Sequence, residues 1–151
     1  MLLITGLLGC SGTLCEGSIP RDAQVLEHQL AGLGYGEFGD SGFGDSSSRV
    51  LQDQDALDAY LAEVGGTLDL DVDFSSEVVF ANSWVDGGCD ELTYTVVFQD
   101  GTLRLRREEL TGGCDAWFPQ LDFVVTEHRD ATDIDFCETV VEWERRGPWP
   151  F

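Results

Sequence analysis

After residue 66, hydrophobic and polar residues alternate along most of the chain with the period of two that is typical of β-strands. In residues 67–73, three aspartates alternate with Leu68, Leu70 and Val72, so the carboxylates and the apolar side chains are expected on opposite faces. The strands that this alternation predicts are residues 67–73, 77–84, 92–99, 102–109, 121–127 and 136–144. We therefore expect a domain built mainly of antiparallel strands.

One segment has the spacing of a long helix, and it is predicted over residues 54–64. Asp53 is a suitable N-cap, and Gly65 and Gly66 end the pattern. The apolar stripe of this helix consists of Leu57, Tyr60, Leu61 and Val64. Before the helix we expect an extended segment or first strand at 19–30, a glycine-rich loop at 31–48 and a short extended piece at 49–51.

The dipeptide Asp100-Gly101 is the two-residue signal of a type I′ hairpin. Counting outward from this turn, the apolar cross-strand pairs are Phe98 with Leu103 and Val96 with Leu105. A second pair is expected between residues 121–127 and 136–144. Together these elements predict a mainly β (α+β) fold: an antiparallel curled sheet or small sandwich of about six strands, with the helix against an open end.

Composition places the chain among acidic globular proteins. Its 151 residues suggest a single domain, and a hydrophobic content of 42% is enough for a core. The formal net charge is −21, and all 8 basic residues are Arg. Because such a surface repels phosphate groups, nucleic acid is not expected as a partner, whereas divalent cations, basic partners or a salty medium would suit it. The interpretation we prefer is that the charge serves solubility, together with a codon bias against Lys.

The first ten residues, MLLITGLLGC, resemble the end of a bacterial lipoprotein signal peptide, with an aliphatic residue three positions before Cys10 and a small residue just before it. The run is too short to span a bilayer, and no Lys or Arg precedes it. The alternative is a buried first strand. By resemblance to Gram-negative lipoproteins, Ser11 after the lipidated Cys10 implies sorting to the outer membrane, with the domain facing the periplasm or the exterior. The predicted organisation is a signal peptide at 1–9, a lipidated Cys and tether at 10–18, one globular domain at 19–146 and a tail at 147–151.

Export would allow disulfide bonds. Without Cys10, four cysteines remain: Cys15, Cys89, Cys114 and Cys137. Four cysteines allow three different sets of disulfide bonds. Counting from the hairpin turn places Cys89 opposite residue 112, so a bulge would bring Cys89 within reach of Cys114 and leave Cys15 for Cys137. A Cys114–Cys137 bond is the alternative. The cysteine spacing is not that of a metal site.

We find no complete catalytic motif and predict neither enzyme activity nor a cofactor. Residues 39–42, Gly-Asp-Ser-Gly, match the tetrapeptide around the nucleophile of chymotrypsin-like proteases. However, the chain is too short for that double barrel, and His28 and His128 lack the flanking residues of that family's histidine. The tetrapeptide is therefore interpreted as a chance match in a loop.

Two acidic segments have carboxylates at spacings that could serve a cation. Residues 69–73 begin like a calcium loop, but the twelfth position is Phe80 where a Glu is required, so a solvated strand face is the better interpretation. Residues 37–45 are the better candidate because their glycines free backbone carbonyls to turn inward. The carboxylates of this loop are Glu37, Asp40 and Asp45. We nevertheless predict no metal site.

Residues 49 to about 126 resemble one family. The decapeptide VDFSSEVVFA at 72–81, preceded by a helix and followed by Gly87-Gly88 at the start of a hairpin, is similar to the C-terminal domain of PrcB-type lipoproteins. Where that family has Tyr after the two glycines, this chain has Cys89. The resemblance implies an accessory lipoprotein that binds and stabilises a surface protease complex and has no catalytic residues.

The sequence thus predicts a lipid-anchored envelope protein with a non-catalytic protein-binding domain. Its partner would be another envelope or surface protein, with a protease as one candidate, and it would contact the membrane only through the lipid. The predicted binding residues, beside the Cys89–Cys114 staple, are Trp84, Asp86, Trp117 and Phe118. The alternatives are a small protease inhibitor that uses the 31–48 or 111–119 loop, and a calcium-dependent envelope module.

Overall fold

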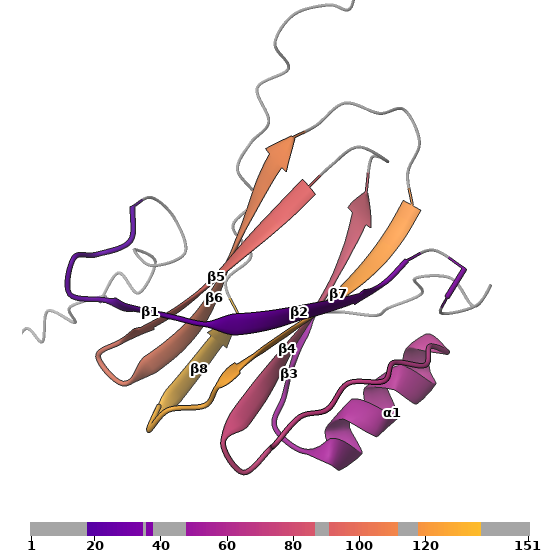
Figure 1. Cartoon of the computed structure of the whole chain (residues 1–151), viewed down its shortest axis with the longest axis horizontal. Helices are drawn as coiled ribbons and strands as arrows, with labels where there is room; N and C mark the ends of the chain where they lie inside the picture. The colour runs from indigo at the N-terminus through magenta and orange to yellow at the C-terminus, as the bar shows by residue number, and fades with distance from the viewer. Residues whose placement is uncertain (1–17, 35, 38–47, 87–90, 112–117, 137–151) are drawn as a thin grey trace, which may run out of the picture.

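The structure is a computed structural model that describes residues 18–34, 36–37, 48–86, 91–111 and 118–136. Within these residues the fold is mainly β, with one helix, α1, at Gln54–Val64 (Figure 1). The strands are β1 (Gln24–Leu26), β2 (His28–Leu33), β3 (Arg49–Leu51), β4 (Glu77–Asp86), β5 (Glu91–Gln99), β6 (Thr102–Thr111), β7 (Phe118–Glu127) and β8 (Asp133–Phe136). The predicted mainly β fold class is confirmed, with eight strands among the described residues in place of about six.

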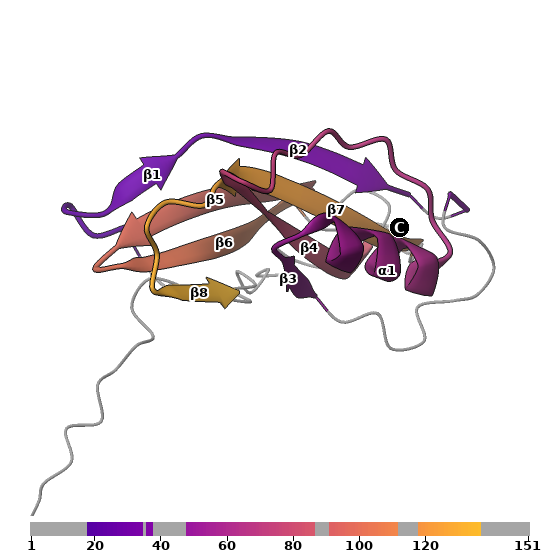
Figure 2. The ribbon, with the colours of Figure 1, turned by 90° about the horizontal axis from the view of Figure 1, so that it is seen from below.

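The strands form two four-stranded sheets, which we call sheet I (β1-β5-β6-β8) and sheet II (β2-β7-β4-β3). All pairs are antiparallel except β6 with β8. β1 and β2 are separated by Glu27 alone and form one continuous ribbon that passes from sheet I into sheet II (Figure 2). On the opposite side, β3 lies beside β8. The two sheets are therefore halves of one curled sheet.

The β5–β6 hairpin has the predicted turn and register. Asp100 and Gly101 have φ values of 51° and 75°, as a type I′ turn requires. Phe98 pairs with Leu103, as the count from the turn predicted. Between Leu92 and Glu91 the register shifts by one residue. The predicted Cys89–Cys114 bond stays a prediction, because both cysteines lie outside the described residues.

Sheet II is covered on both faces. The cluster between the two sheets contains Leu26, Val78, Phe80, Tyr94, Val96, Leu103, Leu105 and Val124. The cluster between sheet II and α1 contains Leu33, Leu51, Leu57, Tyr60, Val64, Val79, Ala81, Leu121, Phe123 and Val125. β4 and β7 supply alternate residues to both clusters, which explains their continuous apolar runs. The helix thus packs on the outer face of sheet II, and its expected place against an open end was wrong.

α1 has the predicted bounds. The Asp53 carboxylate accepts the Ala56 amide at 2.7 Å, and Gly65 ends the helix with φ 71°. Arg49 of β3 fixes the helix to the sheet: it pairs with Glu63 through two contacts of 2.6 and 2.8 Å, and its guanidinium lies 5.1 Å from the ring centroid of Tyr60. No helix among the described residues is long and apolar enough to cross a membrane.

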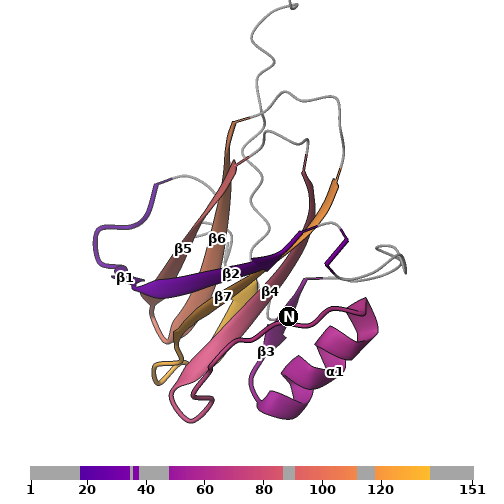
Figure 3. The same ribbon diagram turned by 45° about the vertical axis from the view of Figure 1, so that its right-hand side comes forward.

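Residues 67–73 are not a strand, although their alternation is real. They run beside α1 as an extended segment without sheet pairing (Figure 3). Leu68, Leu70 and Val72 pack against the α1 cluster, while the aspartates between them are exposed. A period of two therefore arises here from packing of side chains on a helix, without a backbone partner.

The expected pairing of residues 121–127 with 136–144 was wrong. Both edges of β7 are occupied, by β2 on one side and β4 on the other, so no further strand fits beside it. β8 instead runs parallel to β6, and residues 137–151 lie outside the described part of the chain. The predicted loop at 31–48 also begins too early, because β2 continues through Gly32 to Leu33.

Candidate functional site

Most of the predicted site residues lie outside the described part of the chain. They are Cys10, Cys15, Cys89, Cys114, Trp117 and Cys137, together with residues 38–45 of the acidic loop at 37–45. Of that loop, Glu37 is described, and its carboxylate accepts the Gly34 amide at 2.7 Å. Among the described residues, no group of three His, Cys, Asp or Glu is arranged to hold a metal ion.

The predicted binding residues Trp84, Asp86 and Phe118 lie at one end of sheet II. Asp86 pairs with Phe118 where β4 meets β7. The Phe118 side chain is 40% exposed. Trp84 is half-buried, and its indole N–H donates to Asp122 Oδ2 at 2.7 Å. Trp84 is thus held by a partner inside the fold.

Trp84 belongs to a polar network that joins the two sheets. The Tyr94 hydroxyl donates to the Asp122 carboxylate and accepts from Asn82 Nδ2 at 2.9 Å. The amide oxygen of Asn82 in turn accepts from Arg107 at 2.7 Å. Burial, and then the charge of Asp122, raise the pKa of Tyr94, so this hydroxyl stays protonated and acts as a donor. The network satisfies buried polar groups and is structural in character.

The β1–β2 ribbon supplies an edge strand to each of the two sheets. β1 pairs only with β5 and β2 only with β7 among the described strands, so one edge of the ribbon is unpaired. Two large apolar side chains stand out from it: Val25 is 56% and Leu30 is 55% exposed. Glu27 is the only Asp, Glu, Lys or Arg in residues 24–33, in a chain with 29 acidic residues.

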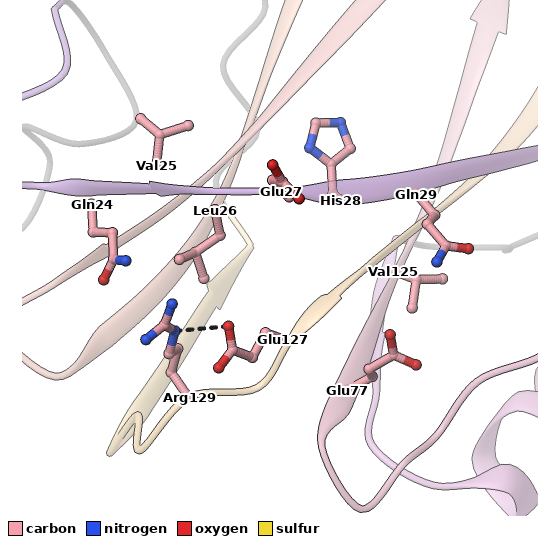
Figure 4. Close-up of a pocket in the computed structure, with 10 residues that line it drawn as sticks. All are labelled: Gln24, Val25, Leu26, Glu27, His28, Gln29, Glu77, Val125, Glu127 and Arg129. Atoms are coloured by element: carbon pink, nitrogen blue, oxygen red, sulfur yellow. Dashed lines mark ion pairs between the residues drawn. The ribbon is translucent and has the colours of Figure 1, made fainter.

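A pocket of about 460 Å³ opens beside the ribbon (Figure 4). It is lined by Gln24, Val25, Leu26, Glu27, His28, Gln29, Glu77, Val125, Glu127 and Arg129. Glu77 pairs with Glu127 in the sheet, and Glu127 Oε2 lies 3.0 Å from Arg129 Nε. The pocket thus combines a free strand edge with three carboxylates and one guanidinium.

Sequence reasoning did not find this site. Residues 19–30 were expected to be extended, but nothing indicated that they form an edge or that Glu77 and Glu127 lie beside them. The one signal present in the sequence is the near absence of charge in residues 24–33 of so acidic a chain.

No protein-family model, curated protein or solved structure matches this chain. The resemblance of residues 72–81 to PrcB-type lipoproteins remains a prediction. The geometry does give that decapeptide a role: Asp73 closes a turn before β4 by accepting from the Ser75 amide at 3.1 Å, and Glu77 accepts the Asp73 amide at 2.9 Å.

Proposed function

We propose that the domain is a non-catalytic protein-binding module that receives an extended segment of its partner along the free edge of β2. In this mode of recognition, the partner's backbone continues the sheet and its alternate side chains contact the exposed face. The observation that carries the proposal is the edge of β2, which has no Asp, Glu, Lys or Arg, is exposed at His28, Gln29 and Leu30, and has no second partner strand among the described residues.

An edge of this kind needs an explanation because natural proteins protect edge strands from pairing. They place Lys, Pro, a bulge or an inward charge there, or cover the edge with another segment. β2 has no Pro, Lys, Arg, Asp or Glu, and Leu30 lies at its centre with most of its side chain exposed to solvent. The acidic surface elsewhere keeps the protein soluble while leaving this edge available.

We further propose that the module is a lipoprotein anchored through Cys10 to the outer membrane, so that its partner is another envelope or surface protein. A protease complex is one candidate, in line with the family resemblance. Mass spectrometry of the intact mature protein, reduced and non-reduced, tests the anchor. We expect cleavage before Cys10, an added acyl mass and two disulfide bonds; an uncleaved, unacylated chain would contradict the anchor.

Strand addition is tested with the full-length tagged protein and solubilised membranes of the source cells. Leu30→Lys places a charge at the centre of the edge, whereas Thr67→Lys makes the same charge change at an exposed position beside α1. We expect the parent and Thr67→Lys to retain one discrete set of partners, and Leu30→Lys to lose it. Equal recovery by all three proteins would exclude the β2 edge as the binding surface.

A further inference from the structure

We infer that the partner segment is basic, and that it carries an Arg or Lys three positions from an apolar residue. This inference rests on the proposed strand addition and specifies the chemistry of its partner. It follows from the places of Leu30 and of three glutamates relative to the same strand edge.

The glutamates lie at one level across sheet II. Glu77 of β4 pairs with Glu127 of β7. His28 of β2 pairs with Thr126, so Glu27, the residue before His28, lies at the level of Glu127. The Thr126 hydroxyl donates to the Glu27 carbonyl at 3.0 Å and holds the ribbon there. An added strand would lie next to Glu27, at the end of this row.

The row has an excess of negative charge. Like charges directly opposite each other destabilise a sheet, and Glu77 and Glu127 form such a pair. Arg129 lies against Glu127, whose side chain is 57% exposed. Three carboxylates and one guanidinium leave a net negative charge, which a basic side chain of the partner would neutralise in part. The pocket of about 460 Å³ at the same place gives such a side chain room.

The apolar contact lies on the other face of the sheet. Leu30 pairs with Val124, whose side chain belongs to the cluster between the sheets. Gln29 pairs with Val125, on the same face as Glu77 and Glu127. Because side chains alternate along a strand, partner residues opposite Leu30 and Glu27 are three apart and point to opposite faces. The expected pattern is therefore an apolar and a basic residue at that spacing, in an extended segment.

Charge complementarity also favours a basic partner over a neutral or acidic one. The protein carries a net charge of −21, which accelerates encounter with cationic segments and repels anionic ones. A segment that is apolar throughout would occupy the edge but leave the glutamate row unchanged.

The test uses the full chain and three labelled, capped peptides of about nine residues on a Thr/Gln background, the length of an ordinary strand. The first has Leu and Arg three positions apart, the second has Leu and Glu three apart, and the third has Leu and Arg two apart. Fluorescence anisotropy gives the dissociation constants. We expect the first peptide to bind roughly tenfold more tightly than either of the others.

Protein variants locate the effect. The double variant Glu77→Gln/Glu127→Gln should abolish the preference for the Arg peptide over the Glu peptide. Glu27→Gln changes an exposed residue and should have the same effect, so it replaces the double variant if that variant folds poorly. Asp69→Asn with Asp71→Asn makes the same charge change as the double variant on exposed residues beside α1 and should preserve the preference.

Each outcome decides between the two proposals. Equal binding of the Arg and Glu peptides, both abolished by Leu30→Lys, would overturn the basic partner and retain strand addition. The same loss of preference in the Asp69/Asp71 variant would show that overall charge, and not the glutamate row, is responsible. No binding of any peptide at millimolar concentration would overturn the inference. Peptide binding that Leu30→Lys leaves unchanged would overturn it too, and would also exclude the β2 edge as the binding surface.

Discussion

Gly32 of β2 lies opposite Asp122 of β7, and a Cβ atom at residue 32 would come within 3.1 Å of Asp122 Oδ1. The Asp122 carboxylate is held in place by Trp84 and Tyr94, so it has little freedom to move away. The glycine in this strand is therefore explained by the space that the polar network between the sheets requires.

We predict that Gly32→Ala lowers the free energy of unfolding by about 1 kcal/mol, at the lower end of the cost of overpacking. Urea denaturation of the full chain measures the effect. Replacing Gly by Ala usually stabilises a protein slightly through the unfolded state, so the opposite sign is informative.

Combining Gly32→Ala with Asp122→Ala separates the contact with the carboxylate from the effect of the substitution on the unfolded chain. Without the carboxylate, Gly32→Ala should become neutral or stabilising, because only the effect on the unfolded chain remains. An equal loss of stability in both backgrounds would show that the contact with Asp122 is not the reason for the glycine.

We predict that the protein loses stability at alkaline pH because the buried Tyr60 hydroxyl ionises there. Burial raises its pKa from 10.0 to about 12, although the nearby Arg49 opposes the shift. The folded state favours the neutral phenol, so this contribution is complete below pH 10 and is lost as the pH rises to 12. The loss should be on the order of 2–3 kcal/mol. The free energy of unfolding, measured from pH 8 to 12, should fall less steeply in Tyr60→Phe than in the parent. An unchanged slope would contradict the prediction.

We predict that the Asp73 carboxylate makes stability fall as the pH becomes acidic. Hydrogen bonds from Ser75 and Ser76 lower its pKa below the ordinary value of 3.8. The folded state favours the carboxylate, so this contribution is present above that value and is lost as the pH falls through the lowered pKa. Asp73→Asn should therefore make stability less dependent on pH below 5, measured by thermal unfolding. Asp71→Asn, the same charge change at an exposed neighbour, should leave the profile nearly as in the parent.

The hairpin turn predicts a strong preference for glycine at residue 101. Its φ of 75° is unfavourable for other residues, and a Cβ atom there would lie 3.1 Å from Thr132 Oγ1. Gly101→Ala should cost about 1–2 kcal/mol. Asp100→Asn, at φ 51°, should change stability by less than about 0.5 kcal/mol because Asn tolerates this conformation. Equal effects of the two substitutions would contradict this account of the turn.

Elements specified by neighbouring residues could be predicted from the sequence. Asp53 and Gly65 bound the helix as expected, because a side chain a few residues away supplies each cap. Asp100-Gly101 set the hairpin register as far as Leu92 for the same reason. Pairings between distant segments could not be predicted in this way: nothing near residues 121–127 shows that β2 and β4 occupy both of their edges.

The candidate site was out of reach for a related reason. Glu77 and Glu127 are fifty residues apart in the sequence and meet only because β4 pairs with β7. The alternation at residues 67–73 was real but ambiguous, because packing against a helix and pairing in a sheet bury the same face.

The ribbon of β1 and β2 also has a consequence for the order of folding. Val25 pairs with Val97 and Leu30 with Val124, so the ribbon can pair with its sheets only after segments 72 and 94 residues further along the chain (97 − 25 and 124 − 30) are in place. Such distant contacts slow folding, whereas α1 and the β5–β6 hairpin form from local ones. We expect docking of the ribbon to limit the folding rate. Until it docks, β5 and β7 each lack one neighbour, and a strand from another chain could take its place.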